Sequence, residues 1–149
     1  MATNPDGQFH FRPLAKGEHV LVACGSPDDA PGISRFVVDE SATYVEVHCR
    51  RGIASQFRVV TTGATPNATM PLPNTRFRIV DSNGVTIEDS HREWPPEVHA
   101  LEQFTAMLAE GRYTIVVARK GFRESRVEFE VPASTAISIP LEPTAPASK

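Results

Sequence analysis

A short pattern occurs twice in this chain of 149 residues, with a constant offset of 94 residues between the copies. It reads Leu-Ala-x-Gly-x and ends in an aromatic or imidazole ring, at Leu14, Gly17 and His19 and again at Leu108, Gly111 and Tyr113. Each copy leads into a β-rich segment, a polar loop and two further short alternating segments. Such a repeat indicates a repeated structural unit, so it constrains the fold more than it constrains the activity.

Hydrophobic and polar residues alternate with a period of two along most of the chain, most clearly in residues 44–49, 127–131 and 137–141. This period is typical of antiparallel strands with one face on a core and the other in solvent. Thirteen prolines and nine glycines suit many short strands joined by turns. Further strands are predicted at residues 19–24, 35–38, 57–61, 76–80 and 113–118. The predicted fold class is therefore an all-β antiparallel β-sandwich.

Residues 95–111 fit two structures. A proline stands at the first turn, apolar residues recur at helical spacing, and a glycine stands where a helix would be capped. The repeat favours a strand, because the equivalent residues 9–14 make a poor helix. We therefore predict a strand at 103–108 after one helical turn at 96–101, with one short helix near 96–108 as the alternative.

Residues 81–84 read Asp-Ser-Asn-Gly, which is a strong turn signal. Asn-Gly supplies the positive φ angles that a tight hairpin needs. The segment also looks like the start of a calcium loop, but the acidic ligands that should follow at alternate positions are absent. We therefore predict a hairpin turn.

The residues around both copies carry a family resemblance. The first copy follows Asp6-Gly7-Gln8-Phe9-His10-Phe11, and the second is preceded by Pro71…Asp81-Ser82-Asn83-Gly84 and followed by Lys120-Gly121-Phe122. These segments resemble the signatures of carboxypeptidase regulatory-like domains, which are transthyretin-like (prealbumin-like) sandwiches related in architecture to immunoglobulin-like ones. His19 stands where the family usually has a tyrosine.

The resemblance implies a division of the chain into unequal units. Residues 55–142 look like a complete seven-stranded module, and residues 1–52 like the C-terminal half of another, packed on or continuing from a further unit. Residues 143–149 are expected to be a disordered tail. Because an incomplete sandwich exposes unpaired strand edges, its strands should pack on the complete module, accept strands from another chain, or belong to a polypeptide that continues upstream. We favour the first or the third.

No catalytic constellation is visible, so we predict that the protein is not an enzyme. The five histidines form no HExxH motif and no His-x-His pair, and no Gly-x-Ser-x-Gly elbow occurs. The weakest alternative is a hydrolase of the transthyretin-like type, whose terminal Tyr-Arg-Gly-Ser is missing here. A net charge of −3 with scattered basic residues argues against nucleic-acid binding. We predict no cofactor and no metal site.

Trp94 is the only tryptophan and lies in the polar, proline-bounded run formed by His91, Arg92, Glu93 and Trp94. An exposed aromatic ring beside hydrogen-bonding side chains is the platform that a sugar ring or a peptide requires. These four residues are therefore the candidate ligand-binding site. The alternative, which we favour, is that Trp94 folds back and caps the sandwich core.

Cys24 and Cys49 each end a β-like segment. They form a disulfide if their Cα atoms come within about 7 Å. The alternative, which we favour on the sequence alone, is that both are small buried hydrophobic residues. No CxxC or His-rich spacing accompanies them, so a zinc site is not expected.

Together these features favour a non-catalytic accessory or interaction module of a larger, exported bacterial protein. Its partners would be another protein, a glycan, or neighbouring repeat domains of the same polypeptide. A carbohydrate- or peptide-binding module that uses the Trp94 loop is the second candidate. No apolar run approaches the roughly 20 residues that span a bilayer. An extracellular or periplasmic location is expected if the chain is part of a longer exported protein.

Overall fold

The computed structural model describes residue 8 and residues 14–40, 44–61, 75–92 and 102–144, and these are all-β. The strands are β1 (Gly17–Ala23), β2 (Asp29–Ala30), β3 (Gly32–Val38), β4 (Arg50–Arg51), β5 (Ile53–Thr61), β6 (Thr75–Asp81), β7 (Thr86–Arg92), β8 (Glu102–Leu108), β9 (Gly111–Arg119), β10 (Ser125–Val131) and β11 (Ile137–Leu141). The predicted all-β class is confirmed.

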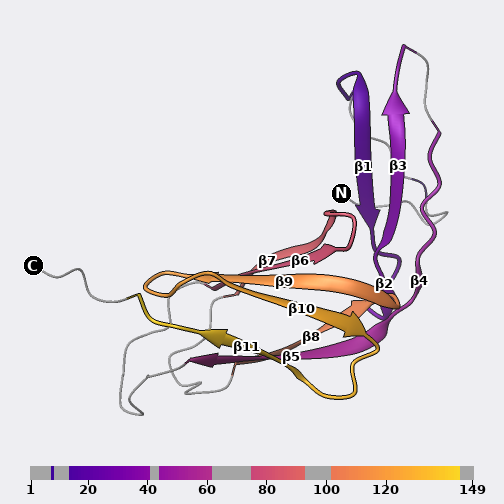
Figure 1. Ribbon diagram of the computed structural model, residues 1–149. Helices are drawn as coiled ribbons and strands as arrows, with labels where there is room; N and C mark the ends of the chain where they lie inside the picture. The colour runs from indigo at the N-terminus through magenta and orange to yellow at the C-terminus, as the bar shows by residue number, and fades with distance from the viewer. Residues whose placement is uncertain (1–7, 9–13, 41–43, 62–74, 93–101, 145–149) are drawn as a thin grey trace, which may run out of the picture.

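Strands β5 to β11 form a sandwich of two sheets (Figure 1). One sheet has the order β10-β9-β6-β7 and the other β11-β5-β8. All pairs are antiparallel except one, since β11 runs parallel to β5 with Ile139 opposite Val59. The predicted sandwich is therefore confirmed, with one parallel edge pair that the alternation of residues 137–141 did not reveal.

The core lies between the two sheets and is made by alternate residues of their strands. Phe57 is its centre, with its ring stacked on Phe104 at 4.8 Å between centroids and meeting the edge of Phe129 at 5.1 Å. The buried cluster comprises Phe57, Val59, Phe77, Ile79, Phe104, Ala106, Leu108, Ile115, Val117, Val131, Ile137, Ile139 and Leu141. Removing this much apolar surface from water is the main source of the sandwich's stability.

The predicted turn joins β6 to β7. Asp81 Oδ1 accepts hydrogen bonds from the backbone N–H of Asn83 at 2.9 Å and of Val85 at 2.7 Å. Gly84 has φ +79°, a backbone conformation that residues other than glycine rarely adopt. The aspartate therefore organises a hairpin turn here, as predicted.

Strand β8 distinguishes between the strand and the helix predicted for the second part of residues 95–111. Residues 102–108 pair with β5 along the whole strand, with Phe104 opposite Phe57. The strand prediction for 103–108 is confirmed, and the alternative of a helix over those residues is wrong because their alternate side chains fill the core. The predicted helical turn at 96–101 lies outside the described residues.

Strands β1 and β3 form a separate two-stranded hairpin that projects from the sandwich (Figure 1). Its root is held by the short β2–β4 pair, where Asp29 is opposite Arg51, and by the hydrogen bond from Gly52 N–H to Asp28 C=O, 2.9 Å.

Residues 44–49, predicted as a strand, are not in any sheet. The backbone oxygen of His48 and the side chain of Val47 lie so close to Gly32 that a Cβ there would come within 2.5 Å and 2.7 Å of them. The segment therefore packs against the start of β3 without forming a ladder with it. Its side chains alternate between exposed and half-buried, as the pattern predicted, but the predicted strand is wrong because alternation does not specify a pairing partner.

Candidate functional site

The repeated pattern builds the same local structure twice, and we call these two structures the glycine corners. Gly17 and Gly111 begin β1 and β9 with φ +134° and +155°. Two residues later, the Tyr113 hydroxyl donates to the carbonyl of Ala109 at 2.9 Å, and His19 Nε2 lies 2.8 Å from the carbonyl oxygen of Ala15. A carbonyl only accepts, so Nε2 carries the proton in that bond.

The hairpins that follow the two glycine corners also match. His19 is opposite Phe36 in β1–β3, and Tyr113 is opposite Phe129 in β9–β10. In each pair the rings stack with centroids 5.7 Å apart, at 26° and 24° between planes. The chain therefore contains one structural unit in two copies. The imidazole of His19 makes the same hydrogen bond in one copy that the phenol of Tyr113 makes in the other.

The surroundings of Tyr113 shift the pKa of its hydroxyl. Burial raises the pKa of Tyr113 above its ordinary value of 10.0, and the nearby negative charge of Asp81 raises it further. The hydroxyl is therefore protonated and available as the donor to Ala109 throughout the neutral range.

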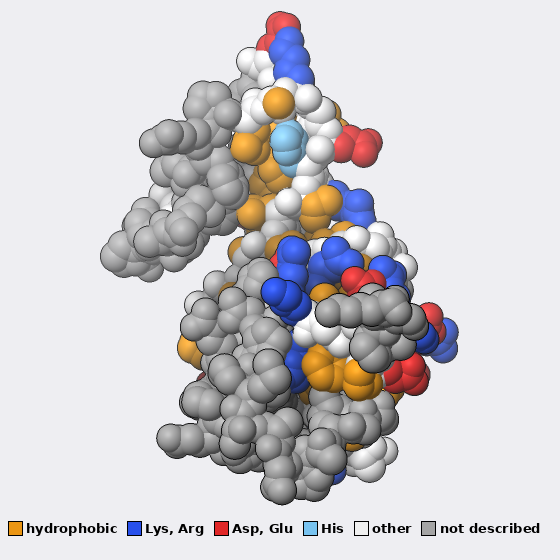
Figure 2. Space-filling view, turned by 90° about the vertical axis from the view of Figure 1, so that its left-hand side faces the viewer, with side chains coloured by type: hydrophobic (Ala, Val, Ile, Leu, Met, Phe, Trp, Pro, Cys, Tyr) orange, Lys and Arg blue, Asp and Glu red, His pale blue; other side chains and the backbone are white. Residues whose placement is uncertain are grey.

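The outer faces of the two matched hairpins differ in chemistry. On β1–β3, Val20, Ile33 and Val37 are 44%, 39% and 59% exposed, and we call these three side chains the apolar hairpin face. The repeat and the strand registers align them with polar residues of β9–β10, namely Thr114, Arg126 and Glu130. Figure 2 shows hydrophobic side chains on the projecting hairpin and a group of Lys and Arg side chains on the body next to it.

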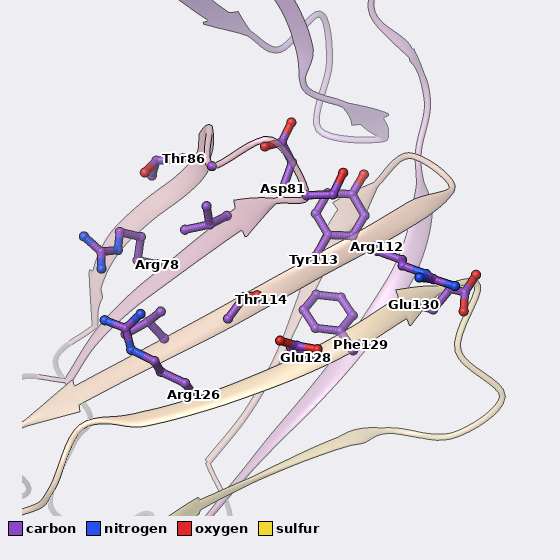
Figure 3. Close-up of a pocket in the computed structure, with 14 residues that line it drawn as sticks. Arg78, Asp81, Thr86, Arg112, Tyr113, Thr114, Arg126, Glu128, Phe129 and Glu130 are labelled. Atoms are coloured by element: carbon purple, nitrogen blue, oxygen red, sulfur yellow. The ribbon is translucent and has the colours of Figure 1, made fainter.

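A groove of about 830 Å³ lies over the outer face of the four-stranded sheet (Figure 3). Arg78 on β6 and Arg126 on β10 are both opposite Val116 of the intervening strand β9. Because neighbouring strands lie about 4.8 Å apart, the two arginines arise from backbones separated by roughly 10 Å. Thr114 and Glu128 form the next row along the same strands.

The arginines near this groove differ in their partners. Arg76 donates through Nε to Asp89 Oδ1 at 2.8 Å and through Nη2 to Oδ2, and Arg126 donates to Glu124 at 3.0 Å. Arg78 Nε is buried, and within the described part of the chain it has no hydrogen-bond partner. The groove therefore suits a ligand with hydrogen-bond acceptors, such as a carboxylate. The described residues that line it include no histidine, which could serve as a general base for a hydroxyl, and no cysteine, which could serve as a nucleophile.

The residues predicted to bind a ligand are not brought together by anything that the structure describes. His91 and Arg92 end strand β7, where the backbone of Arg92 is opposite Thr75, but their side chains lie outside the described residues. Glu93 and Trp94 lie outside them altogether. The predicted Trp94 platform therefore stays a prediction.

The two cysteines lie near each other at the root of the projecting hairpin. Both are free thiols, Cys24 exposed and Cys49 half-buried. Cys49 Sγ donates to the carbonyl of Ala23 at 3.2 Å. Sequence reasoning placed each at the end of a β-like segment but had no signal for their proximity, since it depends on how the β2–β4 pair closes.

Sequence reasoning missed the contrast between the two outer faces and the arginine groove. The signal was present, because Val20 and Val37 occupy the solvent-facing phase of their strands, and Arg76 and Arg78 share one phase of β6. Reading the polar phases of the two repeat copies against each other would have found the contrast between the outer faces, and the spacing of Arg76 and Arg78 on β6 the shared face of these arginines.

Two general findings apply to the part of the chain that the structure describes. It contains no group of three or more His, Cys, Asp or Glu side chains placed to hold a metal ion. It also contains no helix with the length and apolar character needed to cross a bilayer.

No family model matches the chain, and no curated protein matches it in sequence. Among solved structures, a crystal structure of S.CueP is similar over 87% of this chain and 81% of its own, with 12% identity and a TM-score of 0.42. GBS52, the minor pilin of Streptococcus agalactiae, is similar over 99% of this chain and 68% of its own, with 18% identity and a TM-score of 0.39. The class of protein is defined by the fold itself: this is an all-β sandwich protein.

Proposed function

We propose that this protein is a non-catalytic β-sandwich module that binds another protein domain through the apolar hairpin face. The observation that carries the proposal is the exposure of Val20, Ile33 and Val37 by 44%, 39% and 59%. The matched hairpin β9–β10 has the same corner, register and ring stack with a polar outer face, so this architecture does not require the apolar residues. Exposed apolar side chains gathered on one face are typical of an interaction surface.

The energetics of covering this face are favourable. Burying a Val or Ile side chain fully contributes about 1.5–3 kcal/mol, and these three side chains are still partly in water. Among the described strands, only β3 pairs with β1, so the other edge of β1 is one that a partner strand could extend. Glu18 and Arg35 lie on the same outer face of the hairpin and would give the contact a polar rim.

The resemblance of the glycine corners to carboxypeptidase regulatory-like domains supports an accessory role in a larger exported protein. In that setting the partner is a neighbouring repeat domain of the same polypeptide or a separate protein, and the location is extracellular or periplasmic. The division into residues 1–52, 55–142 and 143–149 belongs to the same proposal. Carbohydrate or peptide binding by the Trp94 loop is the second candidate, and it rests on the sequence alone.

A site-specific photo-crosslinker tests the proposal in the cell that makes the protein. Benzoylphenylalanine replaces Val37 in one variant and the aligned residue Glu130 in a second, which serves as the matched control. We expect a discrete adduct with a protein partner from position 37 and none from position 130. The adduct should disappear when Val20→Lys is added, because a buried ammonium group costs several kcal/mol.

Equal crosslinking at both positions, or an adduct at position 37 that survives Val20→Lys, would overturn the proposal. Circular dichroism of the Val20→Lys variant checks that the sandwich is intact. That variant should fold, because Val20 lies outside the buried core cluster.

A further inference from the structure

The side chain of Cys49 lies against both residues that flank Cys24. Its Sγ donates to the carbonyl of Ala23 at 3.2 Å, and its Cβ is 3.4 Å from the point where a Cβ on Gly25 would stand. The two cysteines are 25 positions apart in the sequence, so this contact is made by the fold and not by the local chain. A disulfide joins cysteines whose Cα atoms lie within about 7 Å, and these contacts place Cys49 beside the backbone on both sides of Cys24.

Neither cysteine side chain is packed in the hydrophobic core. Cys24 is exposed, Cys49 is half-buried, and neither belongs to the buried core cluster. The interpretation of both as small buried hydrophobic residues is therefore wrong for Cys24. Partial burial raises the pKa of the Cys24 thiol, and negative charge on Cys49, Glu88 and Asp29 raises it further. Two thiolates therefore disfavour each other at this site.

We propose that Cys24 and Cys49 are a modification site, where an intramolecular disulfide locks the root of the β1–β3 hairpin. The oxidant is a disulfide, either of a thiol–disulfide oxidoreductase or of a small molecule such as oxidised glutathione. The Cys24 thiolate attacks it and releases one thiolate. Cys49 then attacks the mixed disulfide at Cys24 and releases the second, so two protein thiols are oxidised, one external disulfide is reduced, and the two protons pass to the leaving thiolates.

The bond would join the end of β1 to the start of β4 at the root of the hairpin. Cys24 directly follows β1, and Cys49 directly precedes β4. The closed loop would contain β2, β3 and the unpaired segment 44–48, and it would hold that segment against Gly32. The position of the hairpin on the sandwich would then depend on the redox state of its surroundings, whatever the hairpin contacts.

Peptide mapping of the full chain tests the proposal directly. The folded protein is incubated with oxidised glutathione, remaining thiols are blocked with N-ethylmaleimide, and trypsin is added without reductant. Cleavage after Lys16, Arg35 and Arg50 places Cys24 in peptide 17–35 and Cys49 in peptide 36–50. We expect these two peptides to be linked, and the intact monomer to have lost the mass of two hydrogen atoms.

The folded state should speed this reaction. In concentrated guanidinium chloride we expect at least about tenfold less linked peptide at early times, because the fold supplies the high effective concentration of one thiol at the other. The Cys24→Ser and Cys49→Ser variants should each carry one glutathione and form no internal bond. In the oxidised protein, amide hydrogen exchange in β1 and β3 should slow severalfold relative to the reduced protein, while exchange in β9 and β10 stays unchanged.

Two results would overturn the proposal. One is folded protein that carries a glutathione on each cysteine with no linked peptide. The other is linkage no faster in the folded than in the denatured state.

Discussion

At the scale of single residues, the two glycine corners show that the side-chain hydrogen bond to the carbonyl depends on the position of the ring in the corner and not on the residue type that supplies it. His19 and Tyr113 carry different rings, yet each makes its bond to the carbonyl four residues before it. The glycine between ring and carbonyl adopts φ +134° or +155°, which L side chains rarely adopt. The conformation aims the following ring back at the carbonyl, so the glycine is the residue on which the corner depends.

We expect Tyr113→Phe to lower the free energy of unfolding by about 1 kcal/mol, because it removes one hydrogen bond and leaves the Ala109 carbonyl without its donor. Denaturant unfolding followed by circular dichroism measures this change. Tyr44→Phe is the matched control, since Tyr44 is 84% exposed and should give no change. Equal effects of the two substitutions would contradict the assignment.

Alkaline pH provides a second readout of the same prediction. The folded state raises the pKa of Tyr113 above its ordinary value of 10.0, so its contribution is complete below pH 10 and is lost as the pH rises through the folded pKa. The wild type should therefore lose stability above pH 10 more steeply than Tyr113→Phe. Parallel pH curves for the two proteins would count against it.

At the scale of elements, two hairpins with the same register have different support. Strand β9 is paired on both sides, to β10 and β6, and contributes Ile115 and Val117 to the core. Strand β1 pairs only with β3 in the described structure, and Leu21, at 9% exposure, is its one buried side chain. Isolated two-stranded hairpins are marginally stable in water.

We therefore expect amide hydrogen exchange to be faster in β1 and β3 than in β9 and β10 for the reduced protein. The ladder bonds are equivalent, but opening the first hairpin exposes little core, whereas opening the second disrupts the sandwich. Exchange mass spectrometry at peptide resolution measures the difference. Equal protection of the two hairpins would mean that β1–β3 has support that its described contacts do not provide.

At the scale of the whole molecule, the core and the projecting hairpin are separate in the sequence. Every residue of the buried cluster lies between positions 57 and 141. The buried hydrophobic residues described before position 52 are Leu21 and Ala30, at 9% and 2% exposure, and neither belongs to that cluster. The sandwich therefore carries its own hydrophobic core and needs little from the residues before it.

A shortened chain of residues 52–149 should unfold cooperatively, with a free energy of unfolding within about 2 kcal/mol of the full chain, which is what burial of one or two small side chains contributes. Thermal unfolding followed by circular dichroism measures this. A shortened chain without a cooperative transition would show that the hairpin unit and the sandwich are one folding unit.

Features that depend on neighbours along the chain were predictable from the sequence. The strands at 127–131 and 137–141 and the turn at 81–84 were all found as expected. Alternation and turn chemistry act over a few residues, so no tertiary contact is needed to recognise them. The strand prediction for 103–108 succeeded because the repeat supplied a second copy for comparison.

Features that depend on distant pairing were not predictable. Residues 44–49 alternate like a strand but remain outside every sheet, and residues 137–141 alternate like an antiparallel strand but pair parallel with β5. Alternation gives the faces of a strand and says nothing of which edge it joins.

The sequence by itself determined the class of the protein, its turns and the repeated glycine corner, because each follows from local backbone preference and side-chain period. The tertiary structure decided which copy of the corner is built into the sandwich, which faces remain exposed, and that Cys49 lies beside the residues that flank Cys24. These outcomes depend on strands brought together from distant parts of the chain. The physical reason is that burial and proximity are properties of the assembled sheets, so the apolar hairpin face, the arginine groove and the cysteine pair exist only once the sheets have formed.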